Sequence, residues 1–204
     1  KPPLLLILSL GLSTLPGCAA FQVGTDIQSG RQLLLLDKPY QALSHFQRAA
    51  ELSPGYVTDF TEFEEGVWTY VGRAHYDMGE LEKAREALEK ARAEHREDHL
   101  APLYLGLVFV RQGQVERGFK EARVGLRSLK AWLEFNDRYD RAGEYWDPGL
   151  VLEGQVENLL AKIDAVDARW QDITSGLEVL GREFEEEIDR AKDDEWLDLG
   201  DGDD

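Results

Sequence analysis

The chain has 204 residues, of which 43% are hydrophobic and 31% are charged, a composition that suits a globular protein with a core. Its formal net charge of −17 at pH 7 argues against nucleic acid as a partner, because phosphate binding needs clustered lysine and arginine. The acidic excess lies in the last third: residues 1–132 carry 17 acidic and 16 basic residues, whereas residues 133–204 carry 23 and 7. We therefore expect two segments with different roles.

The N-terminal segment has the order of a secretory signal peptide, in which a basic start precedes an apolar run and small residues. Lys1 is followed by Leu4–Leu15, a run of about a dozen residues, against roughly 20 for a membrane-spanning helix. "LPGC", which ends at Cys18, resembles the lipobox of bacterial lipoproteins, and this cysteine is the only one in the chain. The resemblance implies a signal peptide at residues 1–17 and lipid attachment at Cys18. An ordinary signal peptide with an unrelated cysteine is the alternative.

Three stretches within residues 18–132 align with one another. They start at Gly30, Gly72 and Gly106; the last two are 34 residues apart, and the first two are 42 apart, which is 34 plus an insertion of 8. A period of 34 with small residues at fixed offsets resembles the tetratricopeptide repeat, whose unit is a pair of antiparallel helices. The resemblance implies an all-α helical solenoid, and an unrelated helical bundle is the alternative. We expect the repeats at about residues 23–56, 65–98 and 99–132.

The shared small residues are expected where helices approach closely, because small side chains let neighbouring helices touch. The second repeat has the fullest match to the family pattern, since "WTYVG" from Trp68 fits its opening. The insertion is expected within "GYVTDFTEFE", after Pro54 and Gly55. The structural repeat positions are Gly30, Ala42, Ala49, Trp68, Gly72, Ala84, Ala91, Gly106, Gly118 and Gly125.

In this family the first helix of each unit lines a concave groove that binds peptides or other proteins. Arg31 and Arg73 occupy equivalent positions, where arginine could pair with carboxylates in bidentate geometry. Solvated arginines that bond to neighbouring helices are the alternative. The set departs from the variant that clamps C-terminal carboxylates with lysine and asparagine. The implied groove positions are Ile27, Arg31, Leu34, Thr69, Arg73, Tyr76, Asp77, Leu103, Leu107, Val110 and Arg111.

The third repeat contains "LYLGLVFV", residues 103–110, which is apolar almost all round and so predicts a helix covered on more than one side. A candidate cover lies in residues 150–192, after an expected linker at residues 133–149. There, apolar residues alternate in steps of four and three, which is a heptad pattern. This heptad seam consists of Leu152, Val156, Leu159, Ile163, Val166, Trp170, Ile173, Leu177, Leu180 and Phe184.

The heptad seam needs a helical neighbour, which is either the third repeat or the same segment of a second copy, in a homodimer through residues 152–184. We favour packing on the chain's own repeats, because a solenoid needs a capped end. We expect the seam to bend or divide at "TSG", residues 174–176. We also expect the groove of the first two repeats to stay free, with Arg31, Arg73 and Tyr76 exposed for recognition.

The remaining motifs give little sign of catalysis. Residues 193–204 are acidic and glycine-rich, which predicts a disordered tail. His95 and His99 stand four apart in "HREDH", but the metalloprotease pattern needs glutamate directly after the first histidine. The sequence contains no phosphate-binding loop and no GxSxG motif. We therefore expect no enzyme activity, no cofactor and no metal site.

Together the resemblances imply a lipid-anchored adaptor of the Gram-negative cell envelope, which binds another protein or peptide as an assembly or stability factor. Ala19 follows the cysteine in place of the aspartate that is associated with inner-membrane retention. The periplasmic face of the outer membrane is therefore the implied location. A structural oligomer, joined by coiled-coil heptads in the C-terminal segment, is the alternative.

Overall fold

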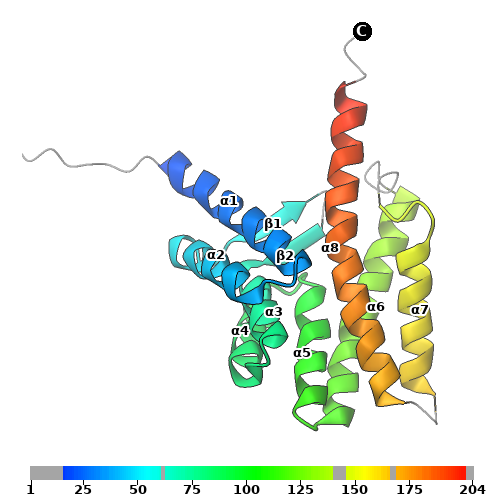
Figure 1. Cartoon of the computed structure of the whole chain (residues 1–204). Coiled ribbons are helices and arrows are strands. Elements are labelled where there is room, and N and C mark those ends of the chain that lie inside the picture. The colour runs from blue at the N-terminus through cyan, green and yellow to red at the C-terminus, as the bar shows by residue number, and fades with distance from the viewer. Residues whose placement is uncertain (1–15, 61–62, 140–145, 166–168, 201–204) are drawn as a thin grey trace, which may run out of the picture.

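The computed structural model describes residues 16–60, 63–139, 146–165 and 169–200 (Figure 1). The described residues form eight helices and one two-stranded sheet, so the chain is mostly helical, as predicted. The predicted signal peptide lies outside the described residues, apart from its last two positions. The backbone of Cys18 lies in the first turns of helix α1.

The first six helices form three helical hairpins that overlap the expected repeats, although the first hairpin begins at Pro16, ahead of the expected start at about residue 23. In each hairpin the two helices pack together and are joined by a short turn. The pairs are α1 (Pro16–Leu35) with α2 (Pro39–Leu52), α3 (Val67–Asp77) with α4 (Leu81–Glu94), and α5 (Leu100–Arg111) with α6 (Val115–Tyr139).

The three hairpin turns share one backbone geometry. A residue with positive φ follows the first helix of each hairpin: Asp37 at 54°, Gly79 at 74° and Gly113 at 80°. Its N–H donates to the carbonyl three residues earlier, and the next N–H donates to the carbonyl five residues before it, at 2.8 to 3.0 Å. This is the Schellman motif, in which glycine is favoured because it adopts positive φ without strain. The three hairpin turns therefore share one backbone structure.

The small residues of the repeat pattern lie where helices touch. A Cβ added to Gly106 would lie 2.7 Å from the carbonyl oxygen of Gly118, and one added to Gly118 would lie 2.6 Å from that of Gly106. Trp68 is half-buried, and its indole N–H donates to the carbonyl of Pro54 at 2.8 Å. A Cβ would also clash at Gly30, Gly72 and Gly125, and Ala42, Ala49, Ala84 and Ala91 are fully buried.

The insertion between the first two hairpins forms the only sheet of the described residues, which the all-α prediction did not include. Strands β1 (Val57–Phe60) and β2 (Phe63–Gly66) pair antiparallel. The segment, "VTDFTEFEEG" at residues 57–66, is rich in β-branched and aromatic residues, which favour strands, and mixes them with acidic ones. On β2, Phe63 and Glu65 are both fully buried. The insertion thus carries a carboxylate into the interior.

The C-terminal segment folds back onto the hairpins. Helix α7 (Val151–Asp164) packs on α6, and α8 (Trp170–Gly200) runs along α7 and α5 to reach α1 (Figure 1). The prediction that the heptad seam packs on the chain's own repeats is confirmed, because its residues join one core with Leu103 and Leu107. The buried seam residues, each at most 6% exposed, are Leu152, Val156, Leu159, Ile163, Ile173, Leu177, Leu180 and Phe184.

Several boundaries differ from those expected. The seam divides between Asp164 and Trp170, whereas residues 174–176 lie inside α8. Trp170 is exposed, and Val166 lies outside the described residues. Helix α6 extends seven residues into the expected linker, as far as Tyr139.

Helix α8 also includes residues 193–200, which we expected to be disordered. The helix is held upstream by buried Ile188 and Ala191, and extending an existing helix costs far less than starting one. An acidic sequence that would not fold alone therefore continues the helix. Residues 201–204 lie outside the described residues.

Candidate functional site

Helix α8 lies against the predicted groove residues and buries most of them. It reaches the first hairpin because the apolar stripe continues to Ile188 and Ala191, both fully buried. Our expectation that the first two hairpins leave their groove free, with Arg31, Arg73 and Tyr76 exposed, is therefore wrong. The buried groove residues, each at most 9% exposed, are Ile27, Arg31, Leu34, Thr69, Arg73, Tyr76, Leu103, Leu107 and Val110, while Asp77 and Arg111 stay exposed.

Two buried arginines of the groove converge on one glutamate of α8. Arg31 donates from Nε to Glu185 Oε2 at 2.6 Å and from Nη2 to the backbone carbonyl of the same residue at 3.1 Å. Arg73 donates from Nη1 to the other carboxylate oxygen of Glu185 and to Glu65 Oε1, the latter at 2.8 Å. We call these four residues the arginine–glutamate cluster. Both arginines pair with a carboxylate, but it belongs to the chain's own α8, and neither pairing with the Glu185 carboxylate is bidentate. The contact is closer to the alternative, arginines that bond to a neighbouring helix, except that these arginines are buried.

The two carboxylates of the cluster have opposite electrostatic environments. Burial alone would raise the pKa of Glu185, but the two arginines outweigh burial and lower it to about 2. Burial raises the pKa of Glu65 well above 4.5, because only Arg73 opposes it and the charge of Glu185 adds to the increase. Glu65 Oε2 and Arg73 Nε have no hydrogen-bond partner among the described residues. Each carboxylate oxygen of Glu185 therefore accepts a hydrogen bond from an arginine, whereas only one carboxylate oxygen of Glu65 does.

A second ionic contact joins α8 to the third hairpin. Arg111 Nη2 lies 2.7 Å from Glu178 Oε1, and its guanidinium stacks 3.8 Å from the centre of the Tyr76 ring. The Tyr76 hydroxyl donates to the same Glu178 oxygen at 2.5 Å. At the other end of the groove, Arg31 Nη1 also contacts Asp189 at 3.0 Å. The first helix of every hairpin thus supplies an arginine that meets an acidic residue of α8.

Two acids on one face of α8 reach all three hairpins. Glu178 contacts Arg111 of α5, and Glu185 contacts Arg31 of α1 and Arg73 of α3. The two acids are seven residues apart, which is two helical turns or about 10.5 Å along the axis. They therefore lie on the same side of α8.

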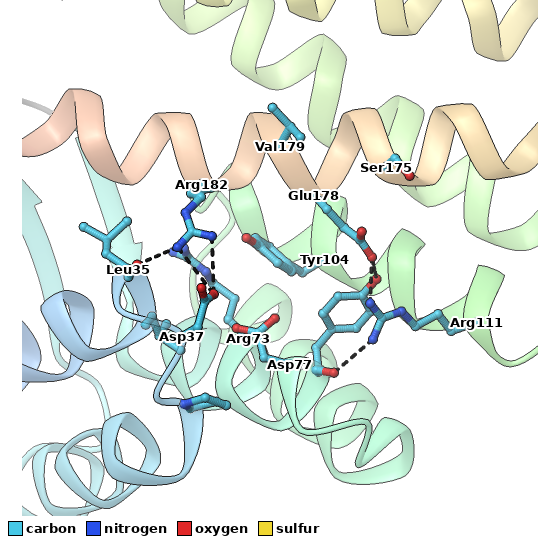
Figure 2. Close-up of a pocket in the computed structure, with 13 residues that line it drawn as sticks. Leu35, Asp37, Arg73, Asp77, Tyr104, Arg111, Ser175, Glu178, Val179 and Arg182 are labelled. Carbon is cyan, nitrogen blue, oxygen red and sulfur yellow. Dashed lines mark hydrogen bonds and ion pairs between the residues drawn. The ribbon is translucent and has the colours of Figure 1, made fainter.

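An open crevice remains beside α8, between the first hairpin turn, α3 and α5 (Figure 2). Its volume is about 480 Å³. Arg182 of α8 bridges one edge, donating to the Leu35 carbonyl at 2.5 Å and to Asp37 Oδ1 at 3.3 Å. Asp77 also lines the crevice. Helix α8 thus covers the groove without filling it completely.

Thr69 contributes to the contact between the second and third hairpins and not to the groove surface. Its hydroxyl donates to Asp98 Oδ2 at 2.6 Å, and the same oxygen accepts from the N–H of Gly66 at 2.8 Å. Asp98 Oδ1 accepts from the N–H of Ala101 at 2.9 Å, at the start of α5. Burial raises the pKa of Asp98, although these three hydrogen bonds oppose the increase. An aspartate just before an apolar helical run is the signal that could have identified this residue.

The two histidines that the sequence singled out have structural surroundings. His99 Nδ1 lies 2.6 Å from Ser128 Oγ, and burial lowers the pKa of this histidine to about 4. His95 is half-buried, and its Nε2 has no hydrogen-bond partner among the described residues. Within the described ranges, no three His, Cys, Asp or Glu side chains gather as metal ligands.

The geometry is that of a groove between helical hairpins that is occupied by the chain's own helix α8. The arginine–glutamate cluster is almost fully buried, and it holds α8 against the first two hairpins. Among the described residues, no helix combines the length and the apolar character needed to cross a bilayer. Comparison of the sequence with models of protein families and with curated proteins gives no match.

Proposed function

We propose that the protein is a non-enzymatic adaptor of the bacterial cell envelope, whose tetratricopeptide-like hairpins bind another protein. The observation that carries the proposal is the helix held in the groove. Its apolar residues are buried and its acids meet arginines of α1, α3 and α5. A surface that binds one amphipathic helix has the chemistry of helix-in-groove recognition.

Assignment of the hairpins to the tetratricopeptide class is part of the proposal. It is supported by the period of 34 residues and by the three Schellman turns of equal geometry. It is also supported by the close helix contacts at the shared glycines. An eight-residue insertion between two repeats is compatible with this pattern, because β1 and β2 pair with each other.

Capture from the native envelope tests the proposal most directly. Cells that carry the tagged full-length chain are cross-linked, and the captured proteins are identified by mass spectrometry. One envelope protein enriched at constant stoichiometry is the expected result. If only further copies of the chain are recovered, the adaptor is wrong and the structural oligomer becomes the better account. Light scattering should give the mass of a single chain, because the heptad seam is buried within one chain.

Lipid anchoring through Cys18, at the periplasmic face of the outer membrane, is the second part of the proposal. It is supported by the lipobox-like residues that end in this cysteine. Cys18→Ala should release the chain from the membrane fraction or leave the signal uncleaved, whereas Ala20→Ser should leave both properties unchanged. Membrane fractionation and intact mass measure the outcome. Identical fractionation and mass for Cys18→Ala and the parent chain would refute the anchor.

A further inference from the structure

We propose that α8 is a displaceable occupant of the groove, and that the partner replaces it with an acidic amphipathic helix of the same pattern. The inference rests on the proposed adaptor function and names the chemistry of its partner. The contacts of α8 define that chemistry, because a competing helix would have to reproduce them.

The first step is the recognition pattern that α8 displays. Its acids at Glu178 and Glu185 are seven residues apart, and Asp189 follows one turn later. Beside them, Leu177, Leu180, Phe184 and Ile188 are fully buried. A competing helix therefore needs acids two turns apart next to an apolar stripe. Three arginines on the groove side favour such a helix over a basic or neutral one.

The second step is the balance of forces that holds α8. Beside its apolar stripe, α8 is held by the buried ion pairs of Glu185, and removal of both partners from water offsets much of the attraction between buried charges. Arg73 Nε and Glu65 Oε2 stay without hydrogen-bond partners among the described residues while α8 is docked. The cluster thus selects the register of α8 more than it strengthens its hold. A competing helix that also forms hydrogen bonds with Arg73 Nε and Glu65 Oε2 would bind the groove more tightly than α8 does.

The third step is access to the groove. The crevice beside α8 leaves Asp77 and Arg111 exposed, and Val179 on the facing side of α8 is 51% exposed. An incoming helix can contact this open edge before α8 leaves. The connection of α8 to the rest of the chain keeps its effective concentration high, on the order of millimolar for short tethers, so a weak competitor fails. The partner must bind the groove more tightly than free α8 does.

The test uses the full chain and a fluorescently labelled peptide of residues 170–192, whose binding is followed by anisotropy. The Glu185→Gln chain, whose own α8 docks less well, should bind the peptide at least tenfold more tightly than the parent chain does. The Glu186→Gln chain is the matched control, because this neighbouring glutamate is exposed and should leave affinity unchanged. A peptide carrying Glu185→Gln should lose at least tenfold in affinity for the Glu185→Gln chain.

A second variant covers the case in which Glu185→Gln prevents folding. Gly181→Ala keeps every charge but places a Cβ too close to the ring and hydroxyl of Tyr104, so it should also loosen α8 and increase peptide binding. Equal peptide affinity for the parent, Glu185→Gln and Gly181→Ala chains would overturn the inference. Dimers formed by either variant would also overturn it and assign the groove to α8 of a second copy.

Failure of this inference is distinguishable from failure of the proposed function. If the peptide exchanges as expected but no envelope protein is captured from cells, the groove accepts a competing helix and the adaptor role is wrong. If a partner is captured equally well by the parent and Gly181→Ala chains and the peptide does not exchange, the adaptor role holds and the partner uses another surface.

Discussion

Replacement of Glu185 by glutamine removes the charge on which Arg31 and Arg73 converge and keeps the shape of the side chain. The carboxylate accepts hydrogen bonds from both guanidinium groups, whereas an amide has one oxygen and presents an N–H₂ group to the other arginine. One charge-assisted bond is therefore lost and the other is weakened. All three side chains are at most 4% exposed, so water cannot replace the lost acceptor.

The expected loss is roughly 3–5 kcal/mol in the free energy of unfolding, the range for removing one member of a buried ion pair. The pH dependence follows from the same contact. The pKa of Glu185 is lowered from 4.5 to about 2, so its contribution is present above pH 4.5 and is lost as pH falls toward 2. The glutamine variant should lack this part of the acid-induced loss of stability.

Urea unfolding at pH 7 and at several lower pH values measures both effects through the midpoint and slope of the transition. Glu186→Gln is the matched control, because the same change at an exposed neighbour should stay within about 0.5 kcal/mol of the parent. Equal midpoints for the two variants at pH 7 would refute the central role of Glu185. A loss at pH 7 with an unchanged acid dependence would refute the electrostatic origin of that role.

Three further predictions concern other parts of the fold. Gly154→Ala should stabilise the chain by about 0.5–1 kcal/mol, because no atom lies near the added Cβ. Gly181→Ala should destabilise it, because overpacking costs about 1–3 kcal/mol. Thermal unfolding measures both changes, and an upward shift of both midpoints would contradict this reasoning. Ala84→Leu should lower the melting temperature by several degrees, while Glu82→Leu at an exposed position should not, and equal melting temperatures would argue against the helix contact. Since burial lowers the pKa of His99 to about 4, stability should fall as pH drops from 6.5 toward 4, and NMR titration of this ring to an ordinary pKa would refute its burial.

The hairpins were predictable because their signal is local and repeated. Small residues recur at one spacing, and Gly79 and Gly113 mark two of the three turns. The third turn is less visible in the sequence, since Asp37 takes the left-handed conformation there. The approximate places of the hairpins therefore followed from the repeated pattern and its resemblance to a family of paired helices, without knowledge of what the helices pack against.

The position of α8 was only partly predictable. The heptad seam indicated a helix that needs a neighbour, but the pattern was followed only to Phe184, and its continuation to Ile188 and Ala191 carries the helix to the first hairpin. The sequence pattern could not show that Glu185 is the acid that pairs with the buried arginines, because it is one of 23 acidic residues in the last third of the chain. Which acid becomes buried depends on the joint packing of α1, α3 and β2 around it.

The distance in sequence between Arg31 and Glu185, 154 residues, has a consequence for biogenesis. Chains grow at about 5–20 residues per second, so the arginine exists for roughly 8–30 s before its glutamate has been made. The hairpins are local structures and can form during that interval, whereas the contact with α8 closes a long loop and must come late. Every nascent molecule therefore passes through a stage in which Arg31 and Arg73 are already present and the helix that will bury them is not.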